Sequence, residues 1–301
     1  MKNETSILLP IPALFSFEEC LWFLNRNYDD CLHVIDENSI TKAIEFEGRI
    51  LLFRIVQTGS FLEVNILKGE ISQSSKDFVV AYVVKWFDLA RNIQPFYDLL
   101  EKDPRLAYMA ADYKGLRLIG IADLFETICW CIIGQQINLS FAYKVKRALV
   151  EKYGKKVDFE GEFYYIFPKS EVLAALTVEE LKEIQFSKQK ALYVIGTAEI
   201  FASGTLTKEH LMALPDFDSR KKALTNLKGI GAWTANYVLM KCLGDPECIP
   251  HGDIGLLNAL ASHNIISQRS ETDKIESFFN IFAGWESYLV FYLWRSLTVR
   301  N

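Results

Sequence analysis

The first hundred residues alternate apolar and polar positions in a way that is typical of β-strands. Residues 50–56 and 61–67 are short runs rich in β-branched and aromatic residues, and a polar segment containing Gly59 separates them. Two such runs around a glycine-containing turn indicate a β-hairpin. Residues 17–25 and 78–89 have apolar positions at helical spacing, which predicts helices that pack on this sheet.

From about residue 120 onward the apolar positions follow helical spacing, and glycine or proline separates one predicted helix from the next. The predicted helices span residues 123–133, 140–152, 178–183, 188–203, 207–214, 219–227, 232–242, 254–261, 273–282 and 287–297. We therefore predict an α+β fold. An N-terminal antiparallel β-sheet domain with helices (residues 1–112) precedes an all-α domain (residues 113–301).

The composition is that of an ordinary globular protein: of 301 residues, 50% are hydrophobic and 24% are charged. This excludes a disordered or low-complexity chain. The longest charge-free stretch, residues 127–143, contains several polar side chains and is not a membrane span. No signal peptide is evident, and the six cysteines show no C-x-x-C motif. We expect a soluble cytoplasmic protein with reduced thiols and no membrane partner.

The charge is unevenly distributed, although the net value is −5. The first 112 residues carry 11 basic and 17 acidic side chains, whereas the rest of the chain carries 22 and 21. Basic side chains gather in residues 144–156, which contain one acid, and in residues 219–241, which contain none. Because a local basic patch is enough to meet a phosphate backbone, the net charge does not exclude a nucleic-acid partner. The alternative for each run is an ordinary solvated helix face.

The most informative stretch, residues 227–235, reads LKGIGAWTA. One predicted helix ends there and another begins, and Gly229 and Gly231 give the turn between them conformational freedom. Ile230 supplies one apolar side chain to anchor the turn. The bare amides at the start of the second helix, with Lys228 beside them, form a favourable site for a phosphate. On the glycines alone, an ordinary helical hairpin with a glycine turn would be the better explanation of the pattern.

The full string resembles the helix–hairpin–helix of the DNA glycosylase superfamily, here at about residues 219–242. In that family a loop rich in glycine and proline follows the hairpin and carries a catalytic aspartate. Residues 244–256 supply such a loop, and Asp253 lies 20 residues after Trp233. Residues 132–140 resemble the family's segment that probes the duplex, and residues 285–295 resemble its C-terminal helix. The N-terminal sheet fits the branch that repairs alkylated bases and the related 8-oxoguanine branch.

The resemblance implies that Asp253 is the catalytic residue. Cleavage of an N-glycosidic bond passes through a sugar cation, so the reaction needs a carboxylate beside the sugar and a water to capture it. The alternative for Asp253 is a helix cap without a catalytic role. Family members with lyase activity carry a lysine just after the hairpin glycines, where this chain has Trp233. The chain also lacks the four cysteines that hold an iron–sulfur cluster in some relatives. We expect a single-function enzyme that needs no cofactor for catalysis.

The resemblance also implies an aromatic pocket for a base extruded from the duplex, lined by Trp233, Tyr237 and Trp285. Alkylated purines such as 3-methyladenine and 7-methylguanine carry positive charge, and aromatic rings attract such a cation by about 0.5–2 kcal/mol each. For each of these three side chains, packing in the core is the alternative.

The predicted contacts with DNA lie in two segments. By resemblance, Gln136 (or Ile137, if the alignment shifts by one) is the wedge that fills the gap left by the extruded base. The predicted DNA-binding residues are Gln135, Gln136, Lys228, Gly229, Gly231, Ala232 and Thr234. The backbone carbonyls of Thr225, Leu227 and Gly229 would hold a structural monovalent cation, which would have no role in the chemistry.

The sequence therefore predicts a monomeric DNA glycosylase that acts in base excision repair. It would release alkylated purines from damaged double-stranded DNA by hydrolysis of the N-glycosidic bond. In a bacterium it would associate with the nucleoid. Two alternatives remain. One is a glycosylase of the 8-oxoguanine type, which Trp233 at the lysine position disfavours. The other is a non-catalytic DNA-binding protein that keeps the hairpin, which the presence of Asp253 disfavours.

Overall fold

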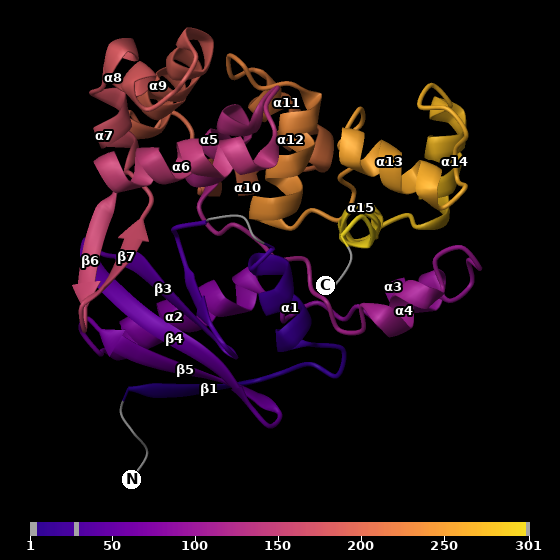
Figure 1. The fold of residues 1–301 in the computed structure, drawn as a ribbon, viewed down its shortest axis with the longest axis horizontal. Coiled ribbons are helices and arrows are strands. Elements are labelled where there is room, and N and C mark those ends of the chain that lie inside the picture. Colours follow the sequence, from indigo (N-terminus) through magenta and orange to yellow (C-terminus); the bar gives the residue numbers. More distant parts are fainter. Residues whose placement is uncertain (1–4, 27–29, 299–301) are drawn as a thin grey trace.

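The computed structural model describes residues 5–26 and 30–298, with a β-sheet on one side of the molecule and a layer of helices on the other (Figure 1). The sheet is antiparallel with the strand order β1-β5-β4-β3-β2. Its strands are β1 (Ser6–Pro10), β2 (Val34–Asp36), β3 (Ser39–Phe46), β4 (Arg49–Thr58) and β5 (Phe61–Lys68). The predicted hairpin is confirmed, because β4 and β5 pair directly and Thr58 lies opposite Phe61.

Two helices pack on the sheet, α1 (Phe17–Leu24) and α2 (Gln73–Trp86), as predicted. Ser72 caps the start of α2 with a capping box. Its hydroxyl accepts from the backbone amide of Ser75, and the Ser75 hydroxyl accepts from the backbone amide of Ser72. Aromatic contacts join α2 to the strands: the rings of Phe46 and Phe78 stack at 4.5 Å between centroids. Burial of these apolar faces is what holds the helix against the sheet.

The helical layer agrees with the prediction to within about two residues at most helix ends. The helices are α3 (Gln94–Leu100), α4 (Tyr108–Asp112), α5 (Leu124–Gly134), α6 (Leu139–Tyr153), α7 (Ser170–Ala174), α8 (Val178–Glu183), α9 (Lys188–Ala202), α10 (Lys208–Met212), α11 (Phe217–Thr225), α12 (Ala232–Val238), α13 (Ile254–Ser262), α14 (Thr272–Ile281) and α15 (Glu286–Ser296). The predicted helix 232–242 changes to a π-helix, η1 (Leu239–Leu243), after α12. Helices α3, α4 and α7 were not predicted, since each is too short to show a clear periodicity.

The second part of the chain is not entirely helical, because β6 (Lys155–Phe159) and β7 (Glu162–Ile166) form a separate hairpin. Its two turn residues, Glu160 and Gly161, both have positive φ, 54° and 85°, as a tight type I′ turn requires. Val157 and Tyr164 pack on apolar residues of β3 and β4. The hairpin is therefore stabilised by the N-terminal sheet that lies beside it (Figure 1).

Helices on the two sides of residue 112 share one core. Phe96 in α3 packs edge-on against Tyr292 in α15, with 4.9 Å between ring centroids, and the hydroxyls of Tyr97 and Tyr292 lie 2.8 Å apart. The domain boundary at residue 112 stays a prediction.

All six cysteines are buried, and none forms a disulfide. In the described ranges, every helix is either too short or too polar to cross a membrane.

Candidate active site

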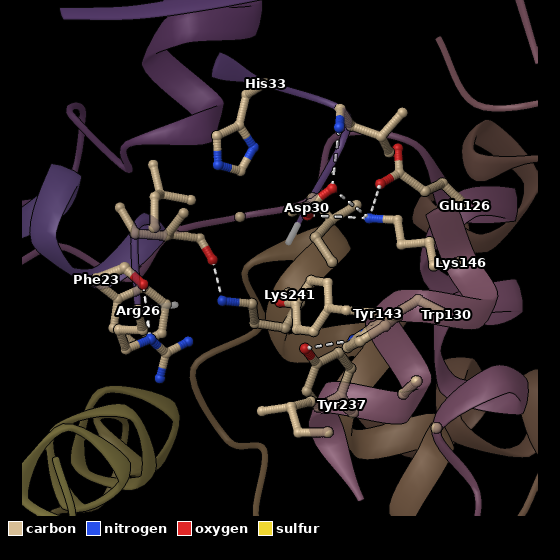
Figure 2. A pocket seen from close by; sticks show the side chains of 18 of the residues that line it. Phe23, Arg26, Asp30, His33, Glu126, Trp130, Tyr143, Lys146, Tyr237 and Lys241 are labelled. Atoms are coloured by element: carbon tan, nitrogen blue, oxygen red, sulfur yellow. Dashed lines mark hydrogen bonds and ion pairs between the residues drawn. The ribbon is translucent and has the colours of Figure 1, made fainter. Parts of the chain in front are cut away.

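A cavity of about 500 Å³ lies between the sheet side and the helical side of the molecule. Strand β3 and helix α2 contribute to its wall from one side, and α5, α6, α12, α13 and α15 contribute from the other. Two kinds of side chain line it. One end carries aromatic rings and the carboxylate of Asp253, and the other carries buried charged groups, many of which Figure 2 shows.

The aromatic end of the cavity is built mainly by α12 and α5. Trp233 and Tyr237, one helical turn apart, stack with 5.4 Å between ring centroids. The indole N–H of Trp130 donates to the Tyr237 hydroxyl at 3.2 Å, and the ring of Trp130 lies 4.6 Å from that of Tyr143. Burial raises the pKa of Tyr237 well above its usual value, so this hydroxyl keeps its proton. The structure thus brings Trp233 and Tyr237 together in one wall, as predicted.

Asp253 lies at the same end, where it begins α13. Its Oδ1 accepts from the amide of Leu256 at 2.7 Å and from the indole N–H of Trp294 at 2.9 Å. Its Oδ2 accepts from the indole N–H of Trp233 at 3.0 Å. Gly255 leaves room for this arrangement, since a Cβ there would lie 3.1 Å from Asp253 Oδ1. Three N–H donors therefore hold the carboxylate in one orientation at the cavity wall.

Trp285, the third aromatic residue predicted for the pocket, does not line this cavity. Its ring packs against Phe96 at 6.0 Å and against Tyr288 at 5.7 Å, and Trp294 occupies the wall instead. The two tryptophans are nine residues apart, about two and a half turns of helix, so they face opposite sides of α15. The sequence could not decide between them because α15 is apolar around most of its circumference.

The hairpin has the predicted construction. Ile230 is 5% exposed and anchors the turn between α11 and α12. Gly229 has φ of +88°, and a Cβ on it would lie 2.4 Å from the ring of Tyr193. Its carbonyl accepts from the Gln135 side-chain amide at 2.9 Å, which ties the α5–α6 loop to the hairpin. Glycine is therefore required at position 229 both by the backbone conformation and by the close contact.

The predicted wedge lies at the tip of the α5–α6 loop. Gln136 is exposed and has φ of 56°, a conformation that is uncommon for residues other than glycine. Ile137 and Leu139, which follow it, line the cavity, and Leu139 is 39% exposed. The loop and the first residue of α6 thus present one polar and two apolar side chains next to the cavity.

The other predicted DNA-binding residues differ in accessibility. Lys228, Gly231 and Ala232 are exposed at the hairpin. Thr234, the third residue of α12, is 3% exposed, and its contact with DNA stays a prediction.

Most of the basic run 144–156 is paired with acids and is not a free basic patch. Lys146 bonds Asp30 and Glu126, and the other pairs are Arg147–Glu151, Lys152–Glu183 and Lys155–Glu45. In the run 219–241, Arg220 pairs with Asp245 at 3.0 Å and Lys241 is buried. The exposed basic residues near the hairpin are therefore fewer than the sequence indicated.

The charged end of the cavity contains an ion-pair cluster that the sequence pattern does not predict. The ammonium of Lys146 lies 3.1 Å from Asp30 and 3.3 Å from Glu126 (Figure 2). Burial alone would lower the pKa of Lys146, but the charges of Asp30 and Glu126 raise it above its usual value. Burial alone would raise the pKa of Asp30, and Lys146 together with nearby basic groups holds it below its usual range. No local sequence signal joins residues so far apart in the chain.

Lys241 also lines the cavity, although it is only 7% exposed. Its ammonium donates to the Ile119 carbonyl and lies 4.8 Å from the centroid of the Phe291 ring. Burial, with a smaller effect from the charge of Arg26, lowers the pKa of Lys241 to about 7. The helical spacing 233, 237, 241 places it on the same face as the two pocket aromatics, which was a signal available in the sequence.

Two family models match the chain in succession. The model described as "8-oxoguanine DNA glycosylase, N-terminal domain" matches residues 29–128, and the one described as "HhH-GPD superfamily base excision DNA repair protein" matches residues 129–283.

Curated relatives are similar over much or nearly all of the chain. A DNA-3-methyladenine glycosylase from Bacillus subtilis is 38% identical over 97% of this chain and 97% of its own length. DNA-3-methyladenine glycosylase 2 from Escherichia coli is 28% identical over 63% of each chain. Among solved structures, a 3-methyladenine DNA glycosylase from Archaeoglobus fulgidus has a TM-score of 0.81 at 23% identity, covering 96% of both chains.

Proposed function

The chain belongs to the HhH-GPD superfamily of base excision DNA repair proteins, and we propose that it is a monofunctional DNA-3-methyladenine glycosylase. Its substrate would be an alkylated purine, such as 3-methyladenine or 7-methylguanine, in double-stranded DNA. The observation that carries the proposal is the Asp253 carboxylate, held by Trp233 and Trp294 at the wall of an aromatic cavity.

This arrangement suits the departure of a cationic base. Stacked rings such as those of Trp233 and Tyr237 attract a positively charged purine more than a neutral one. As the glycosidic bond breaks, positive charge develops on the sugar, and a fixed carboxylate stabilises it without having to reorganise. Asp253 would also orient the water that captures the sugar cation. The base is already a good leaving group because alkylation has made it cationic.

The proposal of a single function rests on the position of the amines. Trp233 occupies the place where lyase relatives have a lysine, and its indole N–H is not a nucleophile. Lys241 lies eight residues further along the same helical face, which corresponds to about 12 Å along the axis. A base would fill the space between Lys241 and the sugar, so this amine would not reach C1′.

The test is base release from methylated duplex DNA, followed by analysis of the strand. We expect release of 3-methyladenine and 7-methylguanine and an abasic strand that stays intact until alkali is added. Borohydride should trap no covalent complex. Release of 8-oxoguanine with a trapped complex would support the lyase alternative, and DNA binding without release of any base would support a non-catalytic protein.

Gly231→Val is expected to weaken DNA binding by about tenfold or more without changing the fold. Gly231 has φ of −94°, and a Cβ there would meet no atom within 4 Å, so valine is accommodated. Its side chain would cover the amides that begin α12, where a phosphate would bind. The measurement is fluorescence anisotropy with several duplex sequences, which should all lose affinity alike. Unchanged affinity at a normal melting temperature would show that the hairpin does not contact DNA.

Three further features belong to the proposal. A monovalent cation would bind the carbonyls of Thr225, Leu227 and Gly229, since neutral oxygen donors suit a hard cation. The Gly229 carbonyl accepts a hydrogen bond from the Gln135 side chain, and the Leu227 carbonyl accepts one from the amide of Ile230. Each of these oxygens keeps a second lone pair.

In the described part of the chain, no cluster of His, Cys, Asp and Glu suits a metal ion. The enzyme would act as a cytoplasmic monomer.

A further inference from the structure

The cavity continues beyond the rings that would hold the base. Trp233, Tyr237 and Lys241 follow one another at four-residue spacing, so the Lys241 amine lies about one helical turn deeper than the Tyr237 ring. Figure 2 shows Lys241 between Phe23 and Arg26 on one side and Tyr143 and Tyr237 on the other. A purine stacked on Tyr237 would therefore have its edge remote from the sugar directed at this amine.

We propose that Lys241 reads the charge of the extruded base, so that its uncharged amine admits a cationic alkylated purine and its ammonium form disfavours one. This inference rests on the proposed function, because it assumes that a base enters the cavity. It names Lys241 as a residue that determines which class of damaged purine the enzyme accepts.

Lys241 differs from Lys146, another buried amine of the cavity, in having no acidic partner. Among the described residues no carboxylate forms an ion pair with it, and its one hydrogen-bond acceptor is the Ile119 carbonyl. Lys146, by contrast, is neutralised by Asp30 and Glu126. A buried ammonium without a partner is costly, so the uncharged amine becomes accessible near neutral pH, consistent with the pKa of about 7.

The two forms of the amine have opposite effects on a base. An ammonium only donates hydrogen bonds, and it repels a cationic purine at short range in a water-poor cavity. The uncharged amine has a lone pair, so it can accept a hydrogen bond from an amino or imino N–H on the base edge. A neutral purine with a carbonyl at that edge would accept from either form.

Three other titratable groups that face the cavity keep one charge state near neutral pH. Burial lowers the pKa of His33 to about 4, and burial raises the pKa of Tyr82 and Tyr237 above their usual values. Lys42, whose pKa burial also lowers, donates to the Leu32 carbonyl at 2.9 Å. The remaining charged or titratable groups are Arg26, Asp30, Glu126, Tyr143, Lys146 and Asp253. Because Lys42 is a buried amine in the same cavity, its variant is the matched control.

The experiment compares single-turnover release of 7-methylguanine from duplex DNA by the wild type and by Lys241→Met between pH 5.5 and 8.5. The rate ratio of wild type to variant cancels any titration of the DNA or of Asp253. One unit below a pKa of about 7, roughly a tenth of Lys241 is uncharged, so the ratio should fall about tenfold from pH 8 to pH 6. For hypoxanthine, a neutral damaged purine, the ratio should stay level or rise as the pH falls.

Two more variants separate a charge effect from a structural one. Lys241→Arg, which carries a permanent charge, should release 7-methylguanine slowly at every pH, whereas the wild type does so only at low pH. Lys42→Met should keep the wild-type pH dependence. A level ratio for 7-methylguanine, an equal fall for both bases, or loss of the pH dependence in Lys42→Met would overturn the inference. Release of no damaged base by the wild type at any pH would overturn the proposed function itself.

Discussion

Asp253→Asn is expected to release alkylated purines about 10²–10³-fold more slowly than the wild type while it still binds DNA. An asparagine keeps one oxygen, which can still accept from the amide of Leu256 and cap α13. It lacks the negative charge that would stabilise the sugar cation, and fixed electrostatic groups in active sites contribute rate factors of about this size. The measurement is single-turnover base release, with DNA affinity determined in parallel.

The asparagine variant also changes the contact with Trp233, because an amide N–H cannot accept the indole N–H that now bonds Oδ2. The matched control is Asp216→Asn. Asp216 caps α11 by accepting from the amide of Ser219 at 2.7 Å, and it does not line the cavity. We expect normal base release from this control. Wild-type turnover by Asp253→Asn would show that Asp253 is a helix cap without a catalytic role.

Lys146→Met is expected to lower the free energy of unfolding by about 3–5 kcal/mol at neutral pH. Lys146 is the shared partner of Asp30 and Glu126, and its removal leaves two half-buried carboxylates without their ion-pair partner. The measurement is urea unfolding of the wild type and the variant. The matched control on the same helix is Lys152→Met, which breaks an exposed pair with Glu183 and should change stability much less.

The loss in Lys146→Met should depend on pH. In the wild type, the pKa of Asp30 is lowered in the folded state, so its charge stabilises the protein above its ordinary pKa, and this contribution is lost as the pH falls. Without Lys146, the largest of the charges that lower the pKa of Asp30 is gone, so the charged carboxylate stabilises the fold less at neutral pH. The difference between the two proteins should therefore shrink as the pH falls below about 4. A difference that stays constant down to pH 3 would show that the charges of this cluster do not determine its stability.

The ion pairs of Lys146 with Asp30 and Glu126 help to hold the two sides of the cavity together. Asp30 comes from the segment before β2, Glu126 from α5 and Lys146 from α6, so the ion pairs join the sheet side to the helical side. Lys241 has no such compensation, and replacing it with methionine should not destabilise the fold in the same way. A buried amine that destabilises the fold and lines a pocket is a candidate for a functional residue.

The features that depend on local order along the chain follow from the sequence alone. The β4–β5 hairpin and the boundaries of the longer helices follow from the period of apolar residues, and the hairpin turn follows from Gly229 and Gly231 around Ile230. The position of Asp253 at the start of a helix after the hairpin is likewise local. Trp233 and Tyr237 share a face because they are four residues apart on one helix.

Tertiary packing sets the features that depend on contacts between distant segments. It placed Trp294 instead of Trp285 beside Asp253, since α15 is buried on nearly all sides and its apolar pattern does not mark one face. It also paired Lys146 with Asp30, which lies 116 residues away in the sequence. The period of apolar residues along a helix or strand indicates which of its faces is buried. The partner of a buried charge is set by packing between elements that are distant in the sequence. The charged end of the cavity was therefore not predictable from the sequence.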